Sequence, residues 1–530
     1  MSEAVHMPAP AQDAGPRAAS TWWQRIDQWS ERAGDHLNPI LVKETRQALK
    51  SRQFVVTFSV LLFAALAWTV AGSLSQMPQI YTTPSASRLL IGYYIVLAIP
   101  MLLVVPLAAY RSLEGEIDDG TLELLSITAL SPWQIVLGKL ASASLQMMLY
   151  FVALFPCMAY AYTLRGVDLP TTLLIVAILV VSALVLTVVA LFLAPLARSR
   201  TGRIITLLLL VGILVIAEYG IGAMVIGMIV YGIPFAMPLV FFLVMTTLLV
   251  SLSLSHLLLA ATAAQLTPES ENRSTHLRIS MMVVTMTLIG IATYATESMP
   301  RNDASTVLSL VGAALLVFWV VCGSLMVAES SVTTPRIRRE LPQSFFARVM
   351  LTWVTPGPAT GLVFATVNIL VVTAFTLFTI RNTLSPTWSF AGGQLQALTR
   401  LSVLLAAYLI GFLIAVRWLI AVVRIRNNPR VEIGVAGLIA VLVLSSLIPY
   451  SIGMHLNDYR PFAYSRWQIT NWVWTLGEAA PSGAVDWTEI GIVVAAVVIA
   501  LIGCLLTMPR IVLPRRTATP EKVQQELETA

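Results

Sequence analysis

The ionisable residues most able to do chemistry gather in one short stretch between two apolar runs. Residues 111–139, with the sequence RSLEGEIDDGTLELLSITALSPWQIVLGK, carry five acidic side chains. Carboxylates at this density cannot lie in hydrocarbon, so the stretch must face water. The chemistry that such a stretch offers is recognition of a soluble partner. The same pattern also fits a plain solvated loop.

The middle of this loop has the pattern of a short amphipathic helix. Thr121 follows Gly120 and is a residue type that caps helices. Leu122 and Leu125 would lie on one face of the helix, with Glu123 off that face. We therefore expect a small helix beside the bilayer.

The end of the loop has the pattern of a helix start. Ser131, Pro132 and Gln134 occupy the cap, first and third positions of a capping box. From Pro132 to about Leu164 the helix would be about 48 Å long, against a hydrocarbon core of about 30 Å. Several turns should therefore project from the membrane. A short helix on such a stalk is suited to receiving a push from a soluble partner.

The chain shows no nucleotide-hydrolysing motif of its own. A phosphate-binding loop of the G-x-x-x-x-G-K-[ST] type is missing, because Gly138 and Lys139 are followed by Leu140 in the wrong setting. We therefore expect no ATP hydrolysis by this chain. The five histidines lack metal-ligand spacing, which disfavours an intramembrane hydrolase or a metal carrier.

One acidic residue lies deep within an apolar run. That residue is Glu218, whereas Glu297 and Glu329 fall at the ends of runs. A carboxylate at mid-membrane costs on the order of 3 kcal/mol or more, so such residues usually have a role. Glu218 is therefore a candidate intramembrane polar site that could be protonatable. A polar contact between packed helices is the plainer alternative.

Composition places the chain among multi-span membrane proteins. Its 530 residues are 57% hydrophobic and 11% charged, and its mean hydropathy is +0.81, so no soluble domain of ordinary size is expected. The net charge of +6 is spread among short loops, so we do not expect nucleic-acid binding. Three cysteines in separate apolar runs are interpreted as buried apolar residues: Cys157, Cys322 and Cys504.

Twelve apolar runs are long enough to span a bilayer, at about 20 residues each. They lie at about 54–74, 90–110, 138–163, 171–196, 204–231, 236–264, 280–297, 306–328, 360–380, 400–423, 431–454 and 488–508. Only Tyr231 to Pro234 separate the fifth and sixth runs, and Gly220, Gly222, Gly227 and Gly232 could break either, so re-entrant half-helices are an alternative there.

The positive charges predict how these spans are oriented. The segments on the side of the two termini hold 26 of the 33 Lys and Arg residues, and the six opposite loops hold 7. This excess predicts that both termini and the 111–139 loop are cytoplasmic. The one long opposite loop, 455–487, is rich in aromatic residues. We expect it to form an interfacial belt or a small external lid.

The chain before the first span predicts a tail and a surface helix. Residues 1–20 are polar and rich in Ala and Pro, which is typical of disorder, and no apolar core of a cleaved secretory signal precedes Phe54. Residues 21–33 place Trp22, Ile26 and Trp29 on one helical face. A helix of this kind lies at the membrane surface.

A second amphipathic helix is expected just before the first span. Asn38 and Pro39 supply its cap and first position, and an apolar arc follows. Lys43, Glu44 and Arg46 lie on the other side of that arc. A basic flank that only fixes orientation is the plainer alternative.

Two of these segments resemble those of a known family. The residues are Glu116, then Gly120-Thr121-Leu122-Glu123-Leu124-Leu125, Leu130-Ser131-Pro132-Trp133 and Leu137-Gly138-Lys139. Their order and spacing are similar to the cytoplasmic signature of type-2 ABC transporter permeases. The stretch NPILVKETRQALKSRQF resembles the amphipathic elbow helix of the same family. The resemblance covers about the first 265 residues, and the second half has no counterpart of the acidic loop.

The resemblance implies the membrane permease subunit of an ABC exporter in a bacterial plasma membrane. In that family the signature provides a coupling helix that contacts a separate ATPase dimer. The implied coupling residues are Glu114, Glu116, Gly120, Thr121, Leu122, Glu123, Leu125 and Pro132, and the implied elbow residues are Pro39, Lys43, Glu44 and Arg46. ATP and Mg²⁺ would bind to the ATPase, and this chain would bind no cofactor or metal. A second copy, or pairing of the two halves, would complete the path for an unknown exported substrate.

The predicted fold class is all-α, a polytopic bundle of about twelve transmembrane helices with N-terminal amphipathic interfacial helices and a cytoplasmic coupling helix. The expected parts are a disordered tail (1–20), interfacial and elbow helices (21–53), a six-span permease domain (54–265), a cytoplasmic linker (266–279), a second six-span half (280–508) and a cytoplasmic tail (509–530). An ion-coupled secondary transporter is the alternative function, and it would depend on Glu218 without an ATPase. A non-transporting membrane scaffold comes third.

Overall fold

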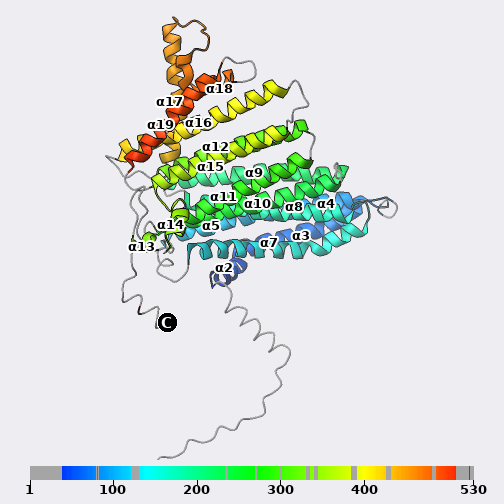
Figure 1. Ribbon diagram of the computed structural model, residues 1–530. Helices are drawn as coiled ribbons and strands as arrows, with labels where there is room; N and C mark the ends of the chain where they lie inside the picture. Colours follow the sequence, from blue (N-terminus) through cyan, green and yellow to red (C-terminus); the bar gives the residue numbers. More distant parts are fainter. Residues whose placement is uncertain are drawn as a thin grey trace, which may run out of the picture. The chain divides into compact units, whose positions relative to one another are not determined.

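A computed structural model describes the helical part of the chain. The described residues are 39–78, 80, 83–120, 131–196, 199–232, 237–268, 271–298, 301–329, 335–339, 344–383, 391–424, 431, 433–479, 485–508 and 525. Every regular element among them is a helix (Figure 1). Twelve helices are long and apolar enough to cross a membrane. This confirms the predicted number of spans, and the chain is a multi-pass membrane protein. The predicted tail at 1–20 and surface helix at 21–33 lie outside the described residues, as does almost all of 509–530.

The chain divides into two compact units, residues 1–234 and 235–530. The first contains α2 (Pro39–Lys50), α3 (Arg52–Ser75), α4 (Ala86–Ala98), η2 (Ile99–Val104), α5 (Val105–Asp118), α7 (Pro132–Thr163), α8 (Leu169–Leu193), η3 (Ala194–Leu196) and α9 (Arg200–Tyr231). The second contains α10 (Met237–Leu266), α11 (Ser274–Ser298), α12 (Arg301–Val327), α13 (Pro335–Arg339), α14 (Phe345–Thr352), α15 (Pro358–Thr383), α16 (Ala391–Arg424), α17 (Ile433–Leu456), η4 (Arg466–Thr470), α18 (Trp472–Glu478) and α19 (Trp487–Thr507).

The boundary between the units differs from the predicted division into halves. The prediction separates two sets of six spans at 266–279, whereas the units divide just before α10. The reason is that α10 packs against α11, the next helix in the chain. The first unit therefore holds five candidate spans and the second holds seven.

The fifth and sixth apolar runs form unbroken helices. The fifth run is α9, which continues through five glycines and is followed by the cap residue Gly232, whose φ is +76°. Glycine adopts that left-handed conformation without the steric cost that other residues meet. The sixth run is α10, which is continuous from Met237 to Leu266. The described residues thus form full-length spans here and not re-entrant half-helices.

The second span contains a local irregularity. Its helix runs from Ala86 to Asp118, but residues Ile99–Val104 form the π-helical segment η2. Pro100 lies within this segment and Pro106 lies just after it. Proline has no N–H to donate, so it interrupts the regular helical ladder. Kinks arise at such positions, and π-helical turns are frequent at functional sites.

Local capping signals place the starts of α7 and α8. Ser131 Oγ accepts a hydrogen bond from the Gln134 N–H at 3.3 Å, and Gln134 Oε1 accepts one from the Ser131 N–H at 2.9 Å. This confirms the predicted capping box, and the 32 residues of α7 give it a length of about 48 Å. Asp168 caps α8 and accepts a hydrogen bond from Thr171 Oγ1 at 2.6 Å. That hydrogen bond lowers the pKa of the Asp168 carboxyl.

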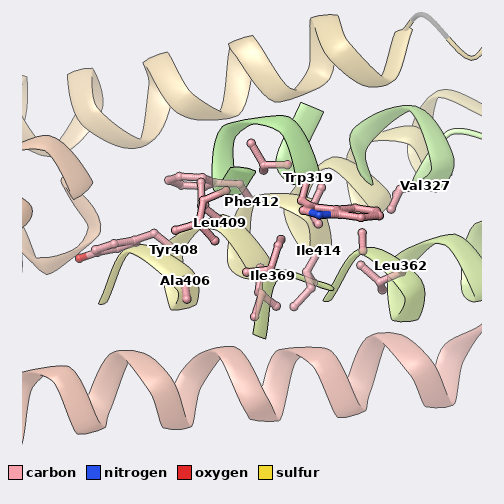
Figure 2. Packing of buried hydrophobic residues seen from close by; sticks show 14 of the residues in the cluster. Trp319, Val327, Leu362, Ile369, Ala406, Tyr408, Leu409, Phe412 and Ile414 are labelled. Atoms are coloured by element: carbon pink, nitrogen blue, oxygen red, sulfur yellow. The ribbon is translucent and has the colours of Figure 1, made fainter. Parts of the chain in front are cut away.

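The second unit is built around α12, which packs against α11, α15, α16 and α17. Trp319 is fully buried on α12, and its Nε1 donates to Thr285 Oγ1 at 3.1 Å. The Trp319 ring also meets the Phe364 ring with 5.5 Å between centroids. Figure 2 shows Trp319, Ile369 and Ile414 turned toward one another between the helices. An aromatic residue therefore fills the centre of this unit while its one polar group is satisfied.

Close approach of two helices makes one glycine in this unit hard to replace. A Cβ built on Gly434 of α17 would lie 2.1 Å from the backbone oxygen of Ser324 on α12. Gly434→Ala should therefore push α17 from α12 and lower stability by about 1–3 kcal/mol. The matched control is Gly503→Ala in α19, where a Cβ meets nothing within 4 Å. Thermal unfolding of both purified variants tests this, and an unchanged melting temperature for Gly434→Ala would show that the two helices are not so closely packed.

The aromatic residues of segment 455–487 pack on one another. The Trp474 ring lies 5.2 Å from Phe462, 5.9 Å from Tyr464 and 6.0 Å from Tyr450, measured between centroids. The Trp472 Nε1 donates to the Leu442 carbonyl at 3.0 Å. Burial in this cluster raises the pKa of Tyr464. The described part of the segment is therefore an ordered cap on α17.

Candidate functional site

The predicted coupling loop is carried by α5 and α7. α5 ends at Asp118, and Gly120 follows in a left-handed turn with φ of +67°. α7 begins at Pro132, in the first helical position. The structure thus describes both ends of the loop. Four predicted residues lie outside the described residues: Thr121, Leu122, Glu123 and Leu125.

A buried ammonium group lies at the base of this loop. Lys139, on the third turn of α7, has a side chain that is 1% exposed, and its Nζ is 3.1 Å from Glu116 Oε2. The same Nζ is 3.4 Å from Glu44 Oε1. Glu116 belongs to α5 and Glu44 belongs to α2, which lies against α7 (Figure 1). One lysine therefore joins the predicted elbow helix to both helices that carry the loop.

Further polar contacts complete this group, which we call the Lys139 cluster (Lys43, Glu44, Ser112, Glu116 and Lys139). Lys139 Nζ donates to Ser112 Oγ at 2.8 Å, and Ser112 Oγ donates to Glu44 Oε2 at 3.1 Å. The exposed Lys43 lies 3.5 Å from Glu116 Oε1. Two ammonium groups thus balance two carboxylates.

The energetics of this arrangement favour a rigid base. Taking charges out of water is costly, and the cost is recovered only when each charge is paired and hydrogen-bonded. Removing one partner of a buried pair costs about 3–5 kcal/mol, because the other charge is left uncompensated. Movement that pulled α2, α5 and α7 apart would carry the same type of cost. The three helices should therefore move together at this level.

Other predicted site residues lie around this base. Glu114 accepts a hydrogen bond from Tyr110 on the preceding turn, at 3.5 Å. Arg46 is exposed on α2 and forms no part of the cluster. Pro39 is the first residue of α2. The geometry therefore brings Lys43, Glu44 and Glu116 together and leaves Arg46 outside.

A second ionic contact ties the loop to another helix. Asp118, the last residue of α5, forms an ion pair with Arg203 in the first turn of α9. Both side chains are partly exposed, so the stabilisation from this pair is about 1 kcal/mol or less. The main effect of this pair is to hold the end of α5 beside the start of α9.

A cavity opens beside the Lys139 cluster. Its volume is about 280 Å³, and its lining includes Glu44, Arg111, Lys139, Gln146 and Tyr150. Valine and alanine side chains of η2 and α5 form its apolar part.

The sequence prediction missed three members of this site. Lys139 entered it only as part of a family signature, and Ser112 and Arg203 did not enter it at all. A lysine inside an otherwise apolar helix start was the available signal, because such a charge needs a partner in the fold. The identity of the partners was not visible, because Ser112 and Glu44 are 68 residues apart in the chain.

The predicted intramembrane residue Glu218 lies apart from this site. It is near the middle of α9, and its Oε2 is buried without a hydrogen-bond partner among the described residues. Burial of an unpartnered polar atom costs free energy, so a position of this kind calls for an explanation.

A second buried ionic group lies in the second unit, where the sequence predicted no site. Arg278 of α11 is fully buried, and its guanidinium donates to Glu329 Oε2 at 2.8 Å. It also donates to the carbonyls of Trp353 at 2.9 Å and Thr355 at 2.7 Å. Glu329 Oε2 accepts the Gly357 N–H at 2.7 Å. Arg278 therefore joins α11, the end of α12 and the start of α15.

The fold defines an α-helical multi-pass membrane protein with an ionic cluster at the base of one acidic loop. Comparisons with protein-family models, with curated proteins and with solved structures find no match to this chain. The function therefore has to be argued from the geometry of the loop and its base.

Proposed function

We propose that this chain is the membrane-spanning permease subunit of an ATP-binding-cassette exporter, coupled to a separate ATPase subunit. The observation that carries the proposal is the Lys139 cluster. It joins α2, the predicted elbow helix, to both helices that carry the acidic loop, which is predicted to face water. A solvated loop without a mechanical role does not need a buried ionic base, because water alone satisfies its charges.

The proposed mechanism transmits a push from the loop into the membrane. Closure of an ATPase dimer would press on the 113–131 region from the cytoplasm. The cluster would make α2, α5 and α7 move as one piece, and the Asp118–Arg203 pair would carry part of the motion to α9. The π-helical segment η2 offers a place where the second span can bend. The result would be a change of access to a path through the bundle.

The proposal specifies the partners of this chain and the membrane in which it would lie. ATP and Mg²⁺ would bind to the ATPase dimer and not to this chain. The chain would lie in a bacterial plasma membrane with both termini cytoplasmic, as the bias of Lys and Arg predicts. A second copy, or pairing of the two halves of the chain, would complete the path for the exported substrate.

Variants of the loop itself test the proposal, because they leave the buried base intact. The chain would be co-expressed with the ATP-binding-cassette ATPase encoded nearest to it in the genome. We expect Leu122→Asp with Glu123→Arg to abolish copurification of the ATPase and its stimulated hydrolysis. Removing the apolar contact and reversing a charge should cost about 3 kcal/mol of binding, or more than a hundredfold in affinity. Membrane insertion and thermal stability should stay unchanged.

The control is Glu297→Arg, which reverses an exposed charge at the end of α11. It should copurify with the ATPase like the unmodified chain. If the loop variant copurified and transported normally, the coupling assignment would be wrong.

Ion-coupled secondary transport is the second candidate, and the unpartnered Glu218 favours it. That function would need no nucleotide. Substrate movement driven by a pH gradient in vesicles without ATPase, and lost in Glu218→Gln, would support it over the first proposal.

A further inference from the structure

We propose that Glu218 of α9 and Tyr94 of α4 form a binding site for the cationic group of an amphiphilic ligand, inside the membrane-spanning part of the first unit. This site is separate from the Lys139 cluster. Its existence does not depend on the proposed coupling to an ATPase.

Both residues present buried polar atoms with no partner. The Glu218 Oε2 and the Tyr94 hydroxyl are each buried without a hydrogen bond among the described residues. Tyr94 is 5% exposed, so its side chain is shielded from bulk solvent. The Glu218 carboxyl as an acceptor and the Tyr94 hydroxyl as a donor are therefore available to a ligand.

The two residues lie on helices that pack against each other, α4 and α9. A Cβ built on Gly222 would lie 4.0 Å from Cε1 of Tyr94. Gly222 comes one turn after Glu218 on the same helix, so both positions share one face of α9. The Glu218 carboxyl also acts electrostatically on the Tyr94 hydroxyl.

There is room beside the carboxyl. Gly222 lies one turn after Glu218 on the same face of α9, and a Cβ built there meets only the Tyr94 ring, at 4.0 Å. The absence of a side chain at this position leaves that side of Glu218 free of bulk. A ligand can therefore approach Glu218 without displacing a side chain.

Among the residues that the structure describes in the first unit, no ion pair joins Glu218 to a basic side chain. The Lys and Arg residues in its spans lie within about two turns of a span end. Among the elements that pack most closely on α9, η2 and α8 contain no titratable side chain. On α4, Tyr93 is engaged with Thr69 at 2.7 Å, and Arg88 lies in the first turn. A counter-charge for the Glu218 carboxylate would therefore come from a bound ligand.

The chemistry is an exchange of a proton for a cation. A carboxylate alone at mid-membrane costs on the order of 3 kcal/mol or more, so the empty site holds a neutral carboxyl group. When a cation binds, the O–H bond of the carboxyl breaks, the proton leaves to water, and the carboxylate pairs with the cation. The Tyr94 hydroxyl then donates to the carboxylate. Binding should release one proton and should strengthen as the pH rises.

The site has a direct structural link to the loop. α9 carries both Glu218 and Arg203, and Arg203 pairs with Asp118 at the end of α5. α4 continues through η2 into α5. Binding of a ligand at this site would therefore affect the position of the loop. Only this last step rests on the proposed function.

The test measures binding of tetraphenylphosphonium, a permanent lipophilic cation, to the full-length chain in nanodiscs without nucleotide. We expect Glu218→Gln to weaken binding at least about tenfold, which corresponds to about 1.4 kcal/mol. Tyr94→Phe should weaken it about fivefold, through loss of one hydrogen bond. Gly222→Leu should block it by filling the space. Affinity of the unmodified chain should rise from pH 6.5 to pH 8.5, with proton release in weakly buffered solution.

The matched control is Glu297→Gln, which removes an exposed carboxyl at a span end and should leave binding unchanged. Binding of neutral triphenylphosphine oxide should not respond to Glu218→Gln. Equal cation affinity in the unmodified chain and Glu218→Gln would overturn the proposal, as would binding no stronger than to empty nanodiscs. Copurification of the ATPase with Glu218→Gln is a separate measurement, so failure of the coupling proposal would be distinguishable from failure of this one.

Discussion

Replacing Arg278 with methionine is expected to lower the apparent melting temperature of the purified protein by on the order of 10 °C. Loss of one partner of a buried ion pair costs about 3–5 kcal/mol, and each kcal/mol shifts the melting temperature of a domain of this size by about 2–4 °C. The effect should be large because Arg278 is fully buried and bonds to groups from two segments outside its own helix. Its removal leaves Glu329 as a charge with weakened compensation.

A double variant separates the charge effect from the loss of packing. Arg278→Met with Glu329→Gln should recover part of the lost stability, because no uncompensated carboxylate remains. Arg273→Met is the control, since this nearby arginine is only half-buried and donates a long hydrogen bond, 3.3 Å, to the Pro268 carbonyl. Its melting temperature should change by less than about 2 °C. Equal melting temperatures for the Arg278 and Arg273 variants would show that the buried guanidinium does not hold this unit together.

Replacing Lys139 with methionine is expected to have a comparable effect on the first unit. Two carboxylates, Glu44 and Glu116, would lose their buried counter-ion, at a cost of about 3–5 kcal/mol. A drop of on the order of 10 °C in apparent melting temperature should follow. Under the proposed function, stimulation of the partner ATPase should fall as well, because α2, α5 and α7 would no longer move together.

The exposed lysine of the same cluster is the matched control. Lys43 has a side chain that is 60% exposed, so Lys43→Met should cost about 1 kcal/mol or less. The triple variant Lys139→Met with Glu44→Gln and Glu116→Gln should be more stable than Lys139→Met alone. If Lys43→Met and Lys139→Met were equally stable, burial of the ammonium group would not be the source of rigidity at the loop base.

Stability and coupling should separate in the triple variant. Glutamine and methionine can restore packing without restoring the ionic ties between the three helices. We therefore expect its melting temperature to recover more than its stimulation of the ATPase. Full recovery of both would mean that contact area alone, and not the ion pairs, transmits the motion.

The sequence predicted the helices well because the signals for them are local. An apolar run of sufficient length forms a span wherever it lies in the chain, since a helix satisfies its own backbone groups in hydrocarbon. The capping box at Ser131 and Gln134 is local in the same way, and it placed the start of α7 correctly. The breaks that glycine offered as an alternative within α9 do not occur, because glycine in a membrane helix is tolerated when neighbouring turns keep their hydrogen bonds.

Only the tertiary structure decided which charges meet. Lys43 and Glu116 are 73 residues apart in the chain, and Arg278 and Glu329 are 51 residues apart. The apolar pattern that locates a membrane helix does not specify its neighbours, because lipid and protein side chains are similarly apolar. Helix pairing instead follows from small residues and polar contacts spread over distant segments, as at Gly434 and Lys139. For this reason the sequence alone determined the spans and the acidic loop, whereas the buried ionic base beneath that loop emerged only from the packing of α2, α5 and α7.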